Sequence, residues 1–398
     1  MGLRTLDRRP LAVPAFRRLW LASGVAAVGG SFSLVAVPAQ LFAFAGSGVV
    51  GAAGAVSLVA LTGSALASGA LADRADRRLV LLGAHAALAA TYALLGLHAA
   101  GPWRSAGVVL ALVAGQGLAL GAILTVTGAV VPRVVPPDLL AAASSLSSLV
   151  RYTGAVVGPL LAGLLLPVTG LAALYLCDAA ALLCVLWAVY RLPALPPRSE
   201  HPAGRRAAGF RLLLTDRLLT AVIAVDLSAM VLGFPAALFP ELAYREFGVS
   251  ALGPLYAAYP AGVCAMALLS GTFGHARRHG ALMAGAALVW AGCVVLLGLA
   301  PGLAVALAAL ALGGAANLVL SSSRNAITQA GVDDAVRGRT QGALTVVLFG
   351  GPQLATAAHG AAGAVLGPRA AICLGGLLTA ATVAAVWRRF PELGASGR

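Results

Sequence analysis

The sequence predicts an all-α integral membrane protein with twelve transmembrane helices arranged as two six-helix bundles. Three observations predict this fold class. The 398 residues are 60% hydrophobic with a mean hydropathy of +0.93, which is more apolar surface than a soluble core can bury. The apolar residues form twelve runs, each close to the ~20 residues that cross a bilayer as a helix. The arginines gather at one end of these runs, as the positive-inside rule requires.

The twelve apolar runs fall into two sets of six. Between the sets lies a polar connection with six arginines and two acidic residues. We therefore expect an N-terminal bundle over 1–190, a cytoplasmic linker over 191–217 and a C-terminal bundle over 218–398. The first run is too long for a signal peptide and eleven others follow it, so we expect it to be kept as a span. The expected spans are 17–43, 49–72, 79–100, 105–131, 140–166, 169–190, 218–243, 251–274, 281–300, 303–329, 340–366 and 369–389.

The chain contains no lysine, and 22 of its 27 arginines fall in inner loops if both ends are placed inside the cell. Each inner loop then contains arginine, as the positive-inside rule expects. The distribution of arginines therefore predicts a multi-pass membrane protein with both termini cytoplasmic. The alanine-rich composition is typical of a GC-rich bacterial genome, so we expect the membrane to be the bacterial inner membrane. The net charge of +14 is then explained by loops beside anionic lipid, so we expect membrane lipid and no nucleic acid as a partner. The other arginines are Arg104, Arg245 and Arg369 in outer loops, and Arg151 and Arg324 within spans.

Enzymatic and metal-binding functions find no support in the sequence. All five cysteines lie in apolar runs, without the CxxC or Cys/His spacing that metal sites and disulfides need. Because there is no lysine, the phosphate-binding loop G-x-x-x-x-G-K-[ST] is absent. No nucleophilic triad is recognisable either. We therefore expect no cofactor, no metal and no catalysis, and any transport to draw on an ion gradient or a partner.

Two sequence features indicate that the halves are related. Ser68, Gly69 and the charged turn after them recur weakly over 270–279, again between the second and third spans of a half. Gly158-Pro159 in the fifth span has a counterpart in Gly351-Pro352 of the eleventh. Parallel six-helix repeats with a site between them are typical of many secondary transporters.

These motifs resemble the major facilitator superfamily. Its signature between helices 2 and 3, G-x-L-a-D-R-x-G-R-R, is matched here except that Asp76 stands where glycine is usual. The fifth span resembles the antiporter motif of drug/proton exchangers, with Ala162 replacing one glycine. The fourth-span arginine of many such antiporters is missing, since Val113 stands three residues before Gln116-Gly117. The signature residues are Gly69, Leu71, Asp73, Arg74, Arg77 and Arg78, and the antiporter-like residues are Gly154, Gly158, Pro159 and Gly163.

Within the superfamily the chain is similar to the enterobactin-exporter subgroup, with macrolide-type efflux proteins as neighbours. The similarity is carried by 14–18, 35–40, 192–197, 209–213, 255–260 and the Gly338-Arg339 turn. It implies a monomeric secondary transporter with the major facilitator fold, exporting a siderophore or related small molecule by proton antiport and alternating access. Asp73 and the arginines after it would form the inner gate. The alternatives are a multidrug or macrolide efflux pump, and a membrane sensor or scaffold that does not transport.

Charges deep in the spans are expected to be functional or paired. Arg151 lies ~18 Å from the inner surface at 1.5 Å per residue, and Asp178 lies at a matching ~17 Å in a ~30 Å hydrocarbon core. We therefore predict an Arg151–Asp178 ion pair, structural or, through Asp178, proton-coupling. For Asp226 the sequence indicates no oppositely charged partner of this kind. The resemblance places helix 7 on the central cavity, so Asp226 is the first candidate to bind and release a proton, and a helix cap or gate contact is the alternative.

Polar and aromatic residues in the spans are candidates to line the substrate cavity. Arg324 and Asn325 lie in the tenth span, on the cavity by resemblance, where a cation would suit an anionic catecholate or hydroxamate. The alternative is an arginine that reaches the inner interface. The further candidates, each with packing or interhelical hydrogen bonding as its alternative, are Gln40, Gln116, Tyr152, Tyr256, Tyr259 and Asn317.

Overall fold

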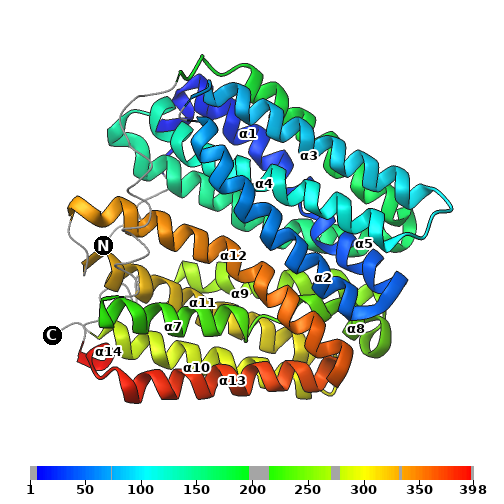
Figure 1. Ribbon diagram of the computed structural model, residues 1–398, viewed down its shortest axis with the longest axis vertical. Helices are drawn as coiled ribbons and strands as arrows, with labels where there is room; N and C mark the ends of the chain where they lie inside the picture. Colours follow the sequence, from blue (N-terminus) through cyan, green and yellow to red (C-terminus); the bar gives the residue numbers. More distant parts are fainter. Residues whose placement is uncertain (1–6, 73, 197–214, 270–277, 331–333, 396–398) are drawn as a thin grey trace. The chain divides into compact units, whose positions relative to one another are not determined.

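The computed structural model describes residues 7–72, 74–196, 215–269, 278–330 and 334–395, and the regular structure in these ranges is helical throughout (Figure 1). Contacts between Cα atoms divide the chain into two compact units. Unit 1 is Met1–Phe44 with Val56–Glu200, and unit 2 is Ala45–Ala55 with His201–Arg398. Gly69 lies within a described helix, whereas Asp73 and most of the expected linker, 197–214, fall outside the described residues.

Nine helical stretches in the described ranges are long and apolar enough to cross a membrane. Two of them, Pro14–Ser68 with 55 residues and Ala142–Tyr190 with 49, are interrupted and each is long enough for two crossings at ~20 residues apiece. The helix Asp334–Leu366, with 33 residues, is not among the nine and supplies the remaining crossing. The twelve-helix architecture predicted from the sequence is confirmed.

Unit 1 is built on α5, which packs against α1 and α3, while α3 also packs against α4. Small residues allow close approach between α2 and α4. An added Cβ at Gly117 would lie 2.9 Å from Cβ of Ala60, so these backbones nearly touch, as is common between membrane helices. The elements are η1 Arg9–Ala12, α1 Pro14–Gly29, α2 Phe32–Ala72, α3 Arg77–Ala100, α4 Ala106–Val134, η2 Pro137–Leu139 and α5 Leu140–Tyr190. The middle of α2, Ala45–Ala55, is assigned to unit 2.

Unit 2 has α10 between α11 and α13, with α9 on the far side of α11 and α12 against α13 and α7. Its core includes the fully buried side chain of Trp290. The elements are α7 Arg217–Val231, η4 Ala236–Leu238, α8 Phe239–Leu242, η5 Ala243–Phe247, η6 Val249–Ala251, α9 Leu252–Leu268, α10 His279–Leu299, α11 Leu303–Ala330, α12 Asp334–Leu366, α13 Pro368–Arg389 and α14 Glu392–Ala395.

Four glycines with positive φ mark corresponding turns of the two halves. Gly46 (φ 76°) and Gly170 (φ 74°) separate the first from the second span and the fifth from the sixth. Gly248 (φ 89°) and Gly367 (φ 79°) do the same for the seventh and eighth, and for the eleventh and twelfth. Side chains with a Cβ disfavour this conformation, so each turn depends on glycine. No other residue in the described ranges has positive φ, which supports the internal repeat.

The first and seventh spans are broken, although the sequence predicted continuous runs over 17–43 and 218–243. α1 ends at Gly29 and α2 begins at Phe32, whereas α7 ends at Val231, shortly before Pro235. Proline lacks an N–H group and glycine weakens a helix, so these residues end the helices. A break inside a membrane requires partners for the backbone groups it exposes. Near the α7 break, Trp290 donates to the Ala229 carbonyl (2.9 Å), Thr379 to that of Ser228 (3.4 Å) and His359 to that of Leu232 (3.0 Å).

Candidate functional site

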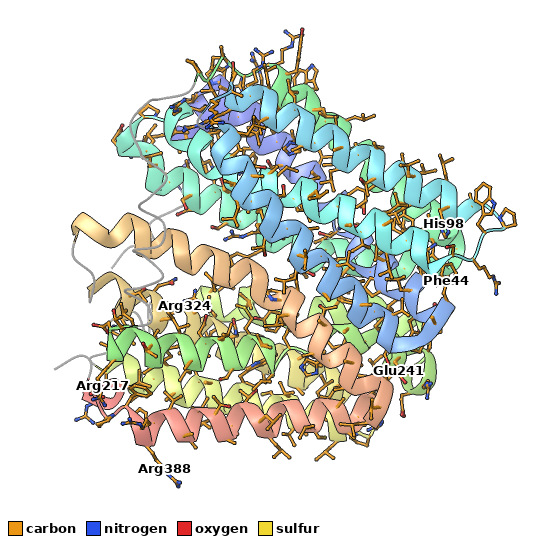
Figure 2. The ribbon with its side chains drawn as sticks, in the orientation of Figure 1. Phe44, His98, Arg217, Glu241, Arg324 and Arg388 are labelled. Carbon is orange, nitrogen blue, oxygen red and sulfur yellow. The ribbon has the colours of Figure 1, made fainter. Side chains whose placement is uncertain are left out.

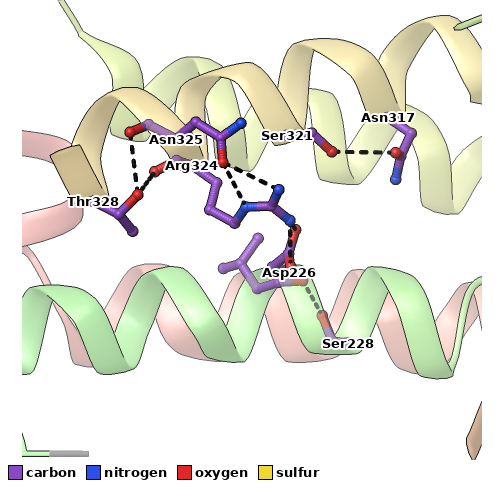
Figure 3. A network of polar contacts seen from close by, with 8 residues as sticks. Asp226, Ser228, Asn317, Ser321, Arg324, Asn325 and Thr328 are labelled. Carbon is purple, nitrogen blue, oxygen red and sulfur yellow. Dashed lines mark hydrogen bonds and ion pairs between the residues drawn. The ribbon is translucent and has the colours of Figure 1, made fainter. Parts of the chain in front are cut away.

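A buried ion pair in unit 2 joins α7 to α11. Nη1 of Arg324 lies 2.9 Å and 2.8 Å from the two carboxylate oxygens of Asp226, and each side chain is only 7% exposed (Figure 3). Nε and Nη2 of Arg324 donate to Oδ1 of the adjacent Asn325 at 3.3 Å and 3.2 Å. Asp226 and Arg324 therefore compensate each other's charge in a buried place, and Asn325 holds the other side of the guanidinium.

Polar side chains continue along α11 on both sides of this pair. Asn317, Ser321 and Asn325 are four residues apart, a spacing that puts them on one face of a helix. Ser321 donates to the Asn317 side chain at 3.4 Å, and Asn325 is exposed. One turn beyond Arg324, Thr328 donates to the Arg324 carbonyl at 2.9 Å. This face of a membrane helix, together with the ion pair, is the candidate functional site of unit 2.

The prediction that Asp226 lacks a partner was wrong, and Arg324 is not an unpaired cation in this conformation. The two residues are 98 positions apart, so neither spacing along one helix nor adjacency of consecutive helices points to the contact. An isolated buried carboxylate and an isolated buried guanidinium would each be costly, and placing them together removes most of that cost. Asp226 and Arg324 both remain site candidates, because a paired buried charge can still take part in transport.

The predicted Arg151–Asp178 pair does not form. Arg151 is exposed, donates to Ser148 at 3.3 Å and stacks over the ring of Tyr152 at 5.3 Å. Asp178 is fully buried, and its Oδ2 accepts the backbone N–H of Ser33 at 2.7 Å. Equal depth does not specify the direction in which a side chain points, and the break at Gly170 separates the two halves of α5. Asp178 therefore binds the N-terminal end of α2, where helix dipoles favour a negative group.

Two further cavity candidates of unit 1, Gln40 and Gln116, are hydrogen-bonded to other polar side chains of the unit. Tyr175 donates to Gln40 at 2.7 Å, and Gln40 donates to Nδ1 of His98 at 3.3 Å. Gln116 donates to the hydroxyl of Tyr92 at 3.3 Å. Sequence reasoning missed His98, Tyr175 and Tyr92, although each is a polar side chain in an apolar run, the same signal that selected Gln40 and Gln116.

At the charged turn, the structure assigns a role to Asp76, the residue that departs from the family pattern. Its Oδ1 accepts the backbone N–H of Arg78 at 2.8 Å, capping α3, and also the N–H of Leu195 at 3.1 Å. Arg77 donates its backbone N–H to the Leu195 carbonyl at 3.2 Å. The side chain of Arg78 lies over the ring of Tyr190 at 5.2 Å, and Arg74 is exposed. Asp76 thus ties the start of the inter-bundle connection to the turn.

The antiporter-like residues of α5 lie where α5 meets α1. A Cβ at Gly154 would collide with the backbone of Ala27, and one at Gly158 with the side chain of Ser31. Gly163 and Pro159 are buried. The glycines therefore let two helices approach closely beside the break between α1 and α2.

The tyrosine candidates of α9 are engaged in packing. Tyr256 donates to the Ala236 carbonyl at 3.0 Å and meets the ring of Phe239 edge-on at 5.0 Å. Tyr259 packs against Phe234 and Trp290 with ring centroids 5.0 Å and 5.4 Å apart. These contacts brace the broken seventh span. Within the described ranges no group of three or more His, Cys, Asp or Glu side chains could hold a metal ion.

The comparisons with known proteins agree with this architecture. The profile of the Major Facilitator Superfamily matches residues 19–356. The chain belongs to the Major Facilitator Superfamily. It is therefore a multi-pass membrane transporter with a small-molecule substrate, in a family of transporters and not of enzymes.

Curated relatives include the Enterobactin exporter EntS of Shigella boydii serotype 18 and of Escherichia coli O139:H28. Each is 31% identical over 372 residues, covering 91% of this chain and 88% of the relative. Among solved structures, a D-xylose-proton symporter superposes with a TM-score of 0.75 at 14% identity, covering 97% of this chain and 99% of that one. A POT family transporter in complex with 5-aminolevulinic acid gives a TM-score of 0.76 at 12% identity, covering 96% of each chain. At such identities the structural likeness concerns the fold alone.

Proposed function

We propose that this transporter exports an anionic siderophore or a related metabolite from the bacterial cytoplasm in exchange for protons. The observation that carries the proposal is the buried Asp226–Arg324 pair, which opens onto the polar face of α11 at Asn325. The name of the curated relatives supports the siderophore class. A catecholate or hydroxamate carries the negative charge that Arg324 can bind.

The pair offers a simple way to link substrate and proton. A substrate that lies between the two side chains places a negative oxygen on Arg324 and donates a hydroxyl hydrogen to the Asp226 carboxylate. The carboxylate then keeps a partner, whereas an isolated buried charge would be costly. A proton on Asp226 removes this acceptor, so substrate and proton compete for the site. Each therefore leaves when the other binds, as exchange requires.

Alternating access between the two six-helix halves completes the proposal. The halves would be 1–190 and 218–398, joined by the linker 191–217. Asp73, Arg74, Arg77 and Arg78 would form the inner gate, and Asp76 would keep the linker's first residues tied to it. Under this proposal Asp73→Asn impairs transport far more than His275→Ala in the weak second copy of the turn.

Transport by inside-out membrane vesicles tests the proposal. With an acidic vesicle interior, vesicles carrying the protein should accumulate an iron-free tricatecholate siderophore, and a protonophore should abolish the accumulation. Asp226→Asn and Arg324→Gln should each lower the initial rate by at least about tenfold, the loss expected when one transition-state contact is removed. Glu246→Gln is the control, because it breaks the exposed Glu246–Arg369 ion pair (3.1 Å) and should transport normally.

The outcomes of the same assay separate the alternatives. Accumulation by Asp226→Asn with undiminished dependence on the pH gradient overturns the coupling role of Asp226. Movement of a macrolide or a cationic dye, without the catecholate, overturns the siderophore assignment and favours multidrug efflux. A folded protein that moves none of them is a sensor or scaffold.

We also infer that both termini face the cytoplasm of the inner membrane. The support is the distribution of arginines among the loops. A C-terminal green fluorescent protein fusion should fluoresce, and a C-terminal alkaline phosphatase fusion should be inactive. The reverse pair of results contradicts the orientation.

A further inference from the structure

Unit 1 contains a hydrogen-bonded chain of three buried side chains from three spans. Tyr175 of α5 donates to Oε1 of Gln40 on α2 at 2.7 Å, and Nε2 of Gln40 lies 3.3 Å from Nδ1 of His98 on α3. Tyr175 is 0%, Gln40 1% and His98 5% exposed. The ring of His98 also meets Phe44 edge-on, with centroids 6.1 Å apart (Figure 2).

The donors and acceptors follow from the orientation of the Gln40 amide, whose oxygen accepts from Tyr175. The amide nitrogen then points at His98, and Nδ1 of His98 accepts, because an amide nitrogen is only a donor. In this arrangement the imidazole is neutral, with its proton on Nε2. That Nε2 atom is buried and has no hydrogen-bond partner among the described residues. A positively charged His98 has hydrogens on both nitrogens, so it can no longer accept from Gln40.

Asp178 lies one helical turn after Tyr175, at a spacing that places residues side by side on a helix. It is 0% exposed, and its Oδ2 accepts the N–H of Ser33, close to the N-terminus of α2. Its Oδ1 is buried without a partner, and within the described ranges no arginine or histidine forms an ion pair with it. Among the described residues, the titratable side chains near enough to interact electrostatically with it are those of Tyr92 on α3 and Tyr175 on α5. An ionised carboxylate here would lack any compensating charge.

We propose that Asp178 and His98, connected by Gln40 and Tyr175, form a proton-binding site in unit 1, separate from the Asp226–Arg324 pair of unit 2. The site holds one proton in either of two arrangements. In the first, the proton is on Asp178 and His98 is neutral, which fits the observed hydrogen bonds. In the second, Asp178 is ionised and the proton is on Nδ1 of His98. The summed charge of the site is zero in both arrangements.

Gln40 connects the two arrangements. When Nδ1 of His98 carries a hydrogen, the Gln40 amide must turn over so that its oxygen accepts from His98. Its nitrogen then donates to Tyr175, whose hydroxyl hydrogen is released from Gln40. That hydrogen can be donated to the neighbouring Asp178 carboxylate, which needs donors in the second arrangement only. A change of protonation at His98, near the end of α3, is thereby transmitted to Asp178.

Infrared difference spectroscopy of the purified full-length protein, titrated with acid and base, tests the site directly. The wild-type protein should show a C=O stretching band of a protonated carboxyl group that is absent from Asp178→Asn. The asparagine oxygen can still accept from Ser33, so this variant keeps the contact with α2 while losing the titratable group. Asp226→Asn is the matched control, a buried carboxylate in the other unit, and should retain the band.

Variants of Gln40 and Tyr175 provide a second test, which does not depend on whether Asp178→Asn folds. Gln40→Met and Tyr175→Phe keep the carboxyl group, and each should shift the midpoint of its titration by about one pH unit, as expected when one hydrogen bond to a buried charge is altered. A structural role for Asp178 alone would leave that midpoint unchanged.

Any one of three results would overturn the proposal. The first is that the spectra of the wild type and Asp178→Asn superimpose at every pH. The second is that the carboxyl band responds to sodium ions at constant pH, and the third is that Gln40→Met and Tyr175→Phe have the same titration midpoint as the wild type. None of these measurements uses a substrate. The siderophore proposal and the unit 1 proton site can therefore fail separately.

Discussion

Nη1 of Arg324 lies 2.9 Å and 2.8 Å from the two carboxylate oxygens of Asp226, although 98 residues separate them in the sequence. Both side chains are almost completely buried. Each therefore supplies the charge that makes burial of the other tolerable, and the consequences for stability differ from those for transport.

Breaking the Asp226–Arg324 pair on one side should destabilise the protein, because it leaves one uncompensated buried charge. Asp226→Asn and Arg324→Met should each cost about 3–5 kcal/mol, whereas the double variant should recover much of the loss. Thermal unfolding in detergent measures the stabilities, and the transport assay should still find the double variant inactive. Additive losses in the double variant would contradict the pairing.

Arg151 and Asp178 should behave independently, because each has other partners. Arg151→Gln combined with Asp178→Asn should show a coupling energy within about 0.5 kcal/mol of zero, the value for residues that share no contact. The measurement is a double-mutant cycle of unfolding free energies. A coupling of several kcal/mol would restore the ion pair predicted from their depths.

Asp76→Ala should loosen the segment 192–196 from the turn before α3. The change removes an acceptor for the N–H groups of Arg78 and Leu195, and loss of a helix cap costs about 1 kcal/mol. Limited trypsin digestion should then cut faster after Arg191. Asp216→Ala is the control, since Asp216 caps α7 through Leu219 (2.8 Å) in the other unit, and equal acceleration in both variants would contradict a specific tie.

Gly154→Ala should destabilise unit 1, because the new methyl group meets the backbone of Ala27. Overpacking of this kind costs about 1–3 kcal/mol. Gly83→Ala in α3 is the matched control: an added Cβ there has nothing within 4 Å, and replacing a helical glycine by alanine stabilises by up to about 1 kcal/mol. Unfolding temperatures of the two variants should move in opposite directions, and a fall in both would remove close packing as the explanation.

Features that depend on composition and local pattern were predictable from the sequence. Apolar runs of membrane-crossing length gave the twelve helices, with boundaries at Leu303 and Leu366 matching the structure. The family motifs also identified the chain's superfamily. These signals are local, so one chain contains them in readable form.

Direction around a helix axis was not predictable. Depth along a span follows from counting residues, but the face on which Arg151, Asp178 or Asp226 lies depends on breaks such as the one at Gly170 and on contacts with distant helices. The breaks of the first and seventh spans were missed for a related reason. Gly30 and Pro235 lie in predominantly apolar runs, and hydropathy does not report a change of backbone direction.

The turns at Gly46, Gly170, Gly248 and Gly367 have a consequence for how the protein is made. Several of these turns leave almost no chain between two spans, as at Gly367, which follows α12 directly and precedes α13. With so short a connection, the second helix of such a pair cannot remain in the cytoplasm after the first has inserted into the bilayer. We therefore expect each such pair to enter the bilayer as a hairpin during synthesis, and a residue that resists positive φ at the turn to delay insertion before it affects the finished protein.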